Sequence, residues 1–155
     1  MTWADFWALI ATLNGEATHA NCRRLAQELS RRPVSYIIGF AERHAEALYR
    51  LNQEKFGTLP VIDLTARDGR PFPQSSDGFR YARCAVVAAG RAVWRASSPT
   101  RTSSFRTPPP SVTANGCCTC RMRRTSWPLA RKWDRTTRYC FESYSNRDGR
   151  PDMPD

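Results

Sequence analysis

The chain has 155 residues, the size of a single domain, and a formal net charge of +10. The positive excess lies in one block: residues 95–133 hold 8 basic and no acidic side chains, whereas residues 1–94 hold 12 and 9, and residues 134–155 hold 4 and 5. No apolar run approaches the about 18 residues that a membrane span needs, and the start lacks the basic region of a signal peptide. We therefore expect a cytoplasmic protein that does not span a membrane.

A first helix is expected directly after the start of the chain. Thr2 is suited to cap it, and Asp5 at the third helical position completes a capping-box pattern. Asn14 and Gly15 should end it. Its apolar residues recur at helical spacing and are expected to pack on the core: Trp3, Phe6, Trp7 and Ile10.

Two further amphipathic helices are predicted before residue 52. One covers Thr18 to Arg31, with Cys22 expected as a small buried thiol. The next should begin with Pro33 at its first position, which suits the fixed φ of proline, and reach about Leu51. The residues expected on its inward face are Val34, Ile37, Ile38, Ala41, Ala45 and Leu48.

A long loop is predicted over residues 52–75, where glycines and prolines interrupt the apolar pattern and residues 67–70 read as a turn. Loops of this length inside compact domains are uncommon and often functional. Two interpretations stay open: a recognition surface, or a crossover that covers a helix end.

The stretch 73–94 is expected to form one long central helix with Ser76 as its N-cap. Its apolar stripe consists of Phe79, Ala82, Val86, Ala89 and Val93. Polar residues near its start are positioned to meet an anion or a partner's carboxylate at the helix N-terminus. This candidate binding surface consists of Gln74, Ser76, Asp77, Arg80 and Arg83. Alternatively, Asp77 and Arg80 simply pair with each other.

Residues 95–133 differ in composition from the residues before them, because they contain no acidic residue and show no apolar periodicity. One interpretation is a disordered basic segment that neutralises phosphates and stacks a base, using Arg121, Arg123, Arg124, Trp127 and Arg131. A metal site is disfavoured because Cys117, Cys118 and Cys120 lack the spacing of zinc ligands. The third interpretation is translation in a shifted reading frame, since codons read one base out of phase overproduce Arg, Pro, Ser, Thr and Cys.

The segments TWADFWALI, VSYIIGFAERHAEALYRLNQEKFG and PQSSDGFRYARCAVVAAGRAVW resemble the bacterial family called domain of unknown function 4240. Members of that family typically continue with Ala-Asp-Pro-like, Leu-Leu-Tyr-Val and Ala-Tyr…Thr-Gly segments. The shifted frame of residues 95–133 permits all three in this order. The resemblance implies a family domain over residues 1–94, an out-of-frame or disordered stretch at 95–133, and a polar tail over 134–155. It implies no activity.

No residue set favours catalysis, a metal or a cofactor. Cys84 is expected to be a packed thiol in a helix interior rather than a nucleophile, and His44 has no Cys, Asp or second His at ligand spacing. The sequence thus predicts a mainly α-helical domain of about four orthogonal helices, with a poorly ordered region at 95–133. We expect a non-catalytic module for protein–protein contact or regulation, whose partner is another protein. The alternative is a nucleic-acid-binding protein that uses residues 95–133.

Overall fold

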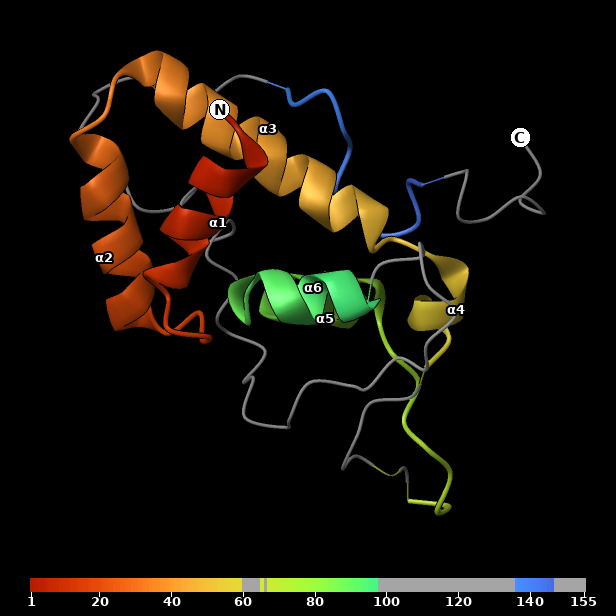
Figure 1. Cartoon of the computed structure of the whole chain (residues 1–155). Coiled ribbons are helices and arrows are strands. Elements are labelled where there is room, and N and C mark those ends of the chain that lie inside the picture. The colour runs from red at the N-terminus through yellow and green to blue at the C-terminus, as the bar shows by residue number, and fades with distance from the viewer. Residues whose placement is uncertain (60–64, 66, 98–135, 147–155) are drawn as a thin grey trace.

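The computed structural model describes residues 1–59, 65, 67–97 and 136–146. Within these ranges the chain forms no strand, apart from an isolated bridge between Thr65 and Pro71, so the mainly α-helical class is confirmed. The helices are α1 (Trp3–Ala11), α2 (His19–Ser30), α3 (Val34–Arg50), α4 (Glu54–Gly57), α5 (Ser76–Ala88) and α6 (Arg91–Ser97) (Figure 1). All but residues 95–97 of the basic stretch 95–133, and Arg121, Arg123, Arg124, Trp127 and Arg131 with it, lie outside the described residues.

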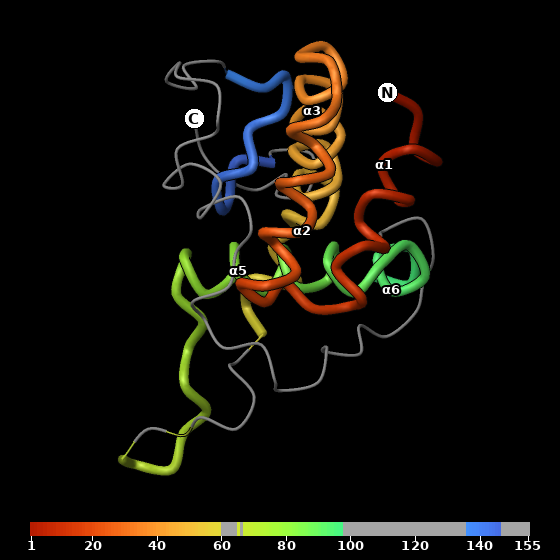
Figure 2. Tube along the Cα trace, turned by 90° about the vertical axis from the view of Figure 1, so that its left-hand side faces the viewer, coloured from red at the N-terminus to blue at the C-terminus, as the bar shows by residue number. Residues whose placement is uncertain are grey.

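The helices pack around α1 and α3, each of which contacts the other and also α2 and α5 (Figure 1). Residues 136–146, which we call the docked segment, contain no helix and follow α3 toward its C-terminal end (Figure 2). Residues 67–73 project away from the helices, and the turn expected at 67–70 is present there (Figure 2). Within the loop expected at 52–75, residues 54–57 form the short helix α4, which corrects that expectation. Residues 60–64 and 66 lie outside the described residues.

The core combines aliphatic residues from four helices with an aromatic cluster. Trp3, Trp7 and Trp94 meet with ring centroids 5.3 to 6.1 Å apart, and the indole N–H of Trp94 donates to the carbonyl of Ala47 at 3.1 Å. Each fully buried large apolar side chain contributes about 1.5–3 kcal/mol to folding. The largest fully buried apolar side chains are Phe6, Ile10, Leu13, Leu25, Leu29, Leu48, Leu51, Phe79, Val86 and Val87.

The first helix starts as its sequence predicts. The Thr2 hydroxyl accepts from the Asp5 N–H at 3.1 Å, and the Asp5 carboxylate accepts from the Thr2 N–H at 3.0 Å, which completes the capping box. The same carboxylate accepts from the Thr2 hydroxyl at 2.6 Å. These hydrogen bonds, the side-chain one first, lower the pKa of Asp5 because they favour its charged form.

Three expectations about α2 and α3 are wrong. Pro33 is the N-cap of α3 rather than its first residue. Val34 is 52% exposed instead of inward, because it lies in the first turn, before α3 reaches the core. Cys22 is buried but is disulfide-bonded, and its partner falls outside the described residues. Cys84 is buried, as expected.

The expected single helix over 73–94 is divided in two. Its N-cap is Ser75, not Ser76, because the Ser75 hydroxyl accepts from the Gly78 N–H at 3.0 Å. α5 ends at Ala88, Gly90 has φ +101°, and α6 continues past Trp94 to Ser97. The change of direction at Gly90 brings Trp94 against Trp3 and Trp7 of α1.

Candidate functional site

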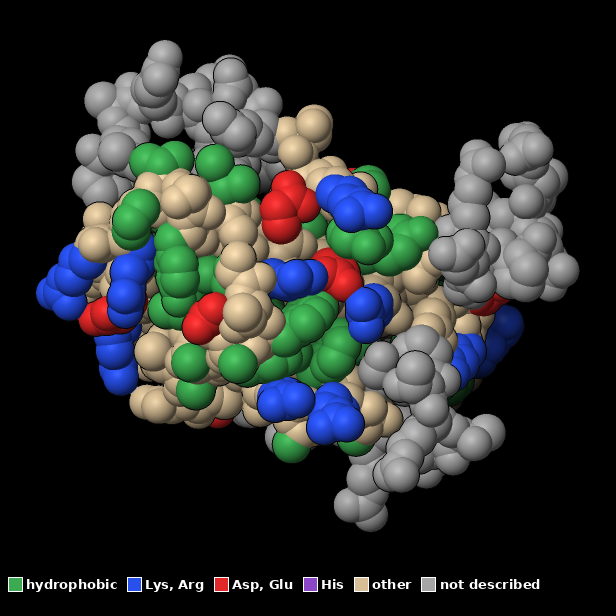
Figure 3. All heavy atoms as spheres, turned by 45° about the horizontal axis from the view of Figure 1, so that its top comes forward, with side chains coloured by type: hydrophobic (Ala, Val, Ile, Leu, Met, Phe, Trp, Pro, Cys, Tyr) green, Lys and Arg blue, Asp and Glu red, His purple; other side chains and the backbone are tan. Residues whose placement is uncertain are grey.

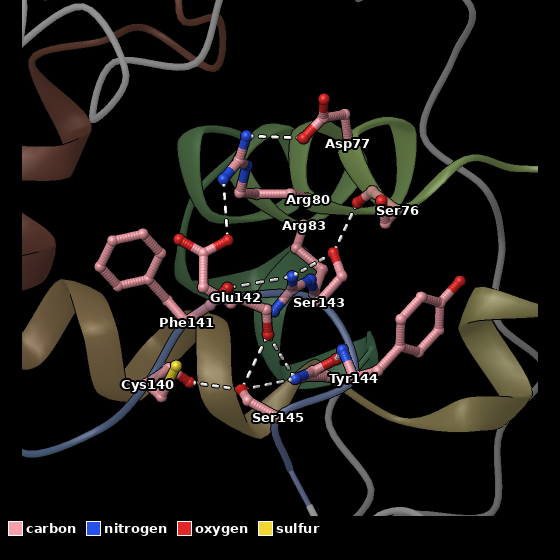
Figure 4. Close-up of polar contacts among 11 residues, drawn as sticks. Ser76, Asp77, Arg80, Arg83, Cys140, Phe141, Glu142, Ser143, Tyr144 and Ser145 are labelled. Carbon is pink, nitrogen blue, oxygen red and sulfur yellow. Dashed lines mark hydrogen bonds and ion pairs between the residues drawn. The ribbon is translucent and has the colours of Figure 1, made fainter.

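The five residues of the candidate binding surface differ in burial, from exposed at the start of α5 to buried further along it. Ser76 and Asp77 are exposed in the first turn of α5, and Gln74 before it is half-buried. Arg80 lies one turn further along and its side chain is only 19% exposed. Arg83, a further turn on, is buried. Figure 4 shows that three of the five, Ser76, Arg80 and Arg83, meet the docked segment.

Arg83 joins α5 to both α3 and the docked segment. One of its terminal nitrogens donates to the carbonyl of Leu48 in α3 at 3.2 Å. The other donates to the carbonyl of Phe141 and to the hydroxyl of Ser143, both at 3.1 Å (Figure 4). Its guanidinium also lies over the Phe79 ring, 4.7 Å from the centroid. The planar fork of the guanidinium suits this task, because it presents several donors in fixed directions at once.

Arg80 and Ser76 hold the neighbouring side chains of the segment. The Arg80 guanidinium pairs with Asp77 at 2.7 Å and with Glu142 at 2.9 Å (Figure 4). The pairing of Asp77 with Arg80 that the sequence left as an alternative is thus present. The Ser143 hydroxyl, which accepts from Arg83, donates to the carbonyl of Ser76 at 2.5 Å.

Asn52 lies two residues after the end of α3. It forms hydrogen bonds to the docked segment through both the NH₂ group and the oxygen of its side-chain amide. Its NH₂ group donates to the carbonyl of Glu142 at 2.9 Å and to the Ser145 hydroxyl at 3.1 Å. Its amide oxygen accepts from the Tyr144 N–H at 2.9 Å. Asn52 is completely buried, whereas its partners in the segment are partly exposed, so these hydrogen bonds are part-buried.

The segment makes a turn at Ser143 and Tyr144, and Tyr144 has φ +68°. Non-glycine residues rarely adopt this left-handed conformation, and tertiary contacts must hold it. The Tyr144 ring lies 5.7 Å from the Phe79 ring. A Cβ added to Gly57 would stand 2.9 Å from the Tyr144 ring, so a side chain at this position would have to displace the ring.

Two further contacts extend the docking toward both ends of the segment. The Arg138 N–H donates to the Glu42 carboxylate at 3.0 Å, and the Tyr139 ring lies 5.3 Å from that of Tyr49. At the other end, the side chain of buried Asn146 donates to the carbonyl of Tyr49 at 3.0 Å. We call the residues that receive the segment the docking surface: Glu42, Tyr49, Asn52, Ser76, Phe79, Arg80 and Arg83.

The chemistry of the docking surface is that of main-chain recognition. Three main-chain groups of the segment, the carbonyls of Phe141 and Glu142 and the N–H of Tyr144, are bonded by Arg83 and Asn52. Over the described residues, no group of three or more His, Cys, Asp or Glu is arranged to hold a metal ion. His44 is buried, and its ring lies 6.0 Å from Phe40 and 6.4 Å from Phe6.

Surface charge on the described part of the molecule is mixed in the view of Figure 3, where Lys and Arg side chains alternate with Asp and Glu around hydrophobic ones. None of the described helices is both long and apolar enough to cross a bilayer.

Sequence reasoning did not anticipate Asn52 or the docked segment. Asn52 stands at the end of a helical pattern, where a polar residue is ordinary. The segment was expected as a polar tail, yet its aromatic residues, Tyr139, Phe141 and Tyr144, are a signal of packing within an otherwise polar stretch. Phe141 packs against the core.

The fold and the docking surface define a small helical protein whose helices hold a later segment of the same chain by its main chain. Residues 1–104 match the family described as "Protein of unknown function (DUF4240)". The chain belongs to this family, which confirms the resemblance of its first 94 residues. No curated protein and no solved structure matches the chain.

Proposed function

We propose that this domain is a non-catalytic protein-interaction module, and that the docking surface is its site for a short peptide. The observation that carries the proposal is Asn52, a fully buried side chain that bonds both an N–H and a carbonyl of a segment about 90 residues away in the chain. In peptide recognition, main-chain hydrogen bonds supply affinity, while side-chain pockets supply specificity.

The docked segment indicates which peptide the site would accept. An acidic residue at the position of Glu142 faces Arg80, and a small hydroxyl at the position of Ser143 fits between Arg83 and the Ser76 carbonyl. An aromatic residue at the next position meets Phe79. The ligand class is therefore a turn-forming peptide of the type acid–serine–aromatic, carried by a partner protein.

The proposal includes no chemical step at this site. The Arg80 and Arg83 guanidinium groups and the Asn52 amide hold the segment by donating hydrogen bonds, and the Asn52 oxygen also accepts one. They suit binding rather than general acid–base catalysis.

A peptide-binding measurement on the full chain tests this proposal. Tyr144→Pro should undock the segment, because proline has neither the N–H that Asn52 binds nor access to φ +68°. A fluorescent peptide of residues 139–146, with serine in place of Cys140, should then bind this variant saturably. The unmodified chain should bind it much more weakly, since its own segment competes at an effective concentration on the order of millimolar.

The matched control adds Asn52→Leu to Tyr144→Pro. Leucine has a similar size but forms none of the three hydrogen bonds, so peptide affinity should fall at least about tenfold, or about 1.4 kcal/mol. Circular dichroism checks that both variants keep their helices. Equal affinity of the two variants, or no binding by a folded Tyr144→Pro chain, would refute the proposal.

The alternative function, nucleic-acid binding through residues 95–133, has support from composition alone: 8 basic residues and no acidic one. Titration of a generic DNA duplex at increasing salt separates the two. Phosphate contacts would give a slope of about −0.9 per contact in log affinity against log salt. We expect no such slope; a steep one that disappears on deletion of 95–133 would favour the alternative.

A further inference from the structure

We propose that the docked segment of one copy can occupy the docking surface of a second copy, which yields a reciprocal dimer. This inference rests on the proposed function, because it needs the segment to act as a separable ligand. It names the partner, a second copy of this chain, for which the complementary contacts are already known from the single chain.

The contacts of the segment place its receptor entirely earlier in the chain. They run from Glu42 in α3 to Arg83 in α5, at sequence separations of 58 to 97 residues. All of these partners precede α6 in the chain, so the same hydrogen bonds form whichever copy supplies the segment.

The connection is long enough to reach a second copy. The 38 residues 98–135 separate the end of α6 from the docked segment. Because neither Cys84 nor Cys140 forms a disulfide, the disulfide of Cys22 engages a cysteine within this connection, at 117, 118 or 120. At least the 15 residues 121–135 then remain, and they span up to about 50 Å when extended, more than the diameter of a small domain. The same copy and a neighbouring copy are thus both within reach.

Charge complementarity favours this partner. Arg80 and Arg83 on the docking surface meet Glu142, a carbonyl and a hydroxyl of the segment, so a second copy brings an acidic side chain to a basic site. The strain at Tyr144 is the same in either arrangement and cancels. The effective concentration of a chain's own segment is on the order of millimolar. The ratio of the protein concentration to this value then determines the fraction of molecules that exchange segments. Exchange should become visible at micromolar concentration only when the intramolecular route is blocked.

Two variants block that route in complementary ways. Asn52→Leu damages the docking surface and keeps the segment, whereas Tyr144→Pro undocks the segment and keeps the surface. Each alone should be a monomer of 17.7 kDa. An equimolar mixture has one intact surface and one intact segment per pair, and light scattering after size exclusion should show a species of twice that mass. A chain that carries both substitutions, mixed with Tyr144→Pro, is the control and should stay monomeric.

A charge exchange provides a second pair whose side chains are partly exposed and whose substitution leaves the core untouched. Arg80→Glu opposes Glu142 within one chain, and Glu142→Arg opposes Arg80. Mixing the two restores both pairs between copies, so the mixture should dimerise at a concentration at least about tenfold lower than either variant alone.

The outcomes separate the two proposals. Binding of the 139–146 peptide to the Tyr144→Pro chain, with both mixtures remaining monomeric, would overturn the exchange and leave the proposed function standing. Failure of the peptide to bind would refute both the proposed function and the exchange between copies. A dimer that forms equally in the double-substituted control would also overturn the exchange, because the contact would then lie elsewhere.

Discussion

Replacement of Arg83 by lysine tests the burial of the docking surface most directly. The guanidinium donates from opposite nitrogens to Leu48 on one side and to Phe141 and Ser143 on the other. A single ammonium cannot reach both sides, so the lysine variant loses at least one such hydrogen bond. Each hydrogen bond to a charged group contributes about 1.5–3 kcal/mol. We expect the free energy of unfolding to fall by about 2–4 kcal/mol.

The matched control is Arg80→Lys, the same change one turn earlier on the same helix. Arg80 pairs with Asp77 and Glu142, whose side chains are 68% and 57% exposed. Exposed ion pairs contribute about 0.2–1 kcal/mol, so this variant should lose less than about 1 kcal/mol.

Thermal unfolding followed by circular dichroism measures the difference between the two variants. A chain of this size shifts its Tm by about 2–4 °C per kcal/mol, which gives a fall of about 4–16 °C for Arg83→Lys and a few degrees for Arg80→Lys. Equal shifts for the two variants would show that Arg83 is as solvated as Arg80 and would refute the docking geometry.

Three further substitutions address other parts of the chain. Gly90→Ala should destabilise the protein by about 1–3 kcal/mol in urea unfolding, because Gly90 has a φ of +101°. Glycine to alanine stabilises a continuous helix, so a stabilisation here would contradict the break between α5 and α6. Gly57→Ala should push the Tyr144 ring away at a cost of about 1–3 kcal/mol and speed hydrogen exchange of the Tyr144 N–H; unchanged exchange would count against the contact. Thr2→Ala should raise the pKa of Asp5 toward its ordinary value in an NMR titration, since the hydroxyl is the largest cause of its lowering. In the native protein the stabilisation from this cap is present above the unfolded-state pKa of Asp5 and is lost as the pH falls through the lowered folded-state value.

Features encoded within a few residues were predictable from the sequence. The cap at Thr2 follows from a side chain that bonds a backbone group three residues away. Most of the inward faces follow from helical periodicity. The division at Gly90 was not predictable, because the apolar stripe from Phe79 to Val93 continues across it and only the meeting of Trp94 with α1 requires the turn.

The candidate site was predictable only in part. The polar residues at the start of α5 were identified, but the burial of Arg83 depends on Leu48 and Phe141, which lie 35 and 58 residues away. No local pattern encodes such a contact, so Arg83 was expected on a binding surface rather than in the interior. The out-of-frame interpretation of residues 95–133 stays a prediction, and the coding DNA across codons 95–134 tests it.

The position of the docked segment in the chain has a consequence during protein synthesis. All six helices that the structure describes leave the ribosome before residues 136–146 do, and synthesis proceeds at about 5–20 residues per second. For the several seconds in between, the amide of Asn52 and the guanidinium of Arg83 face water or whatever nascent or chaperone chain is close by. Stalled or prematurely terminated products that end before residue 139 would lack the docked segment. Their docking surface would stay exposed, and other proteins would be able to bind to it.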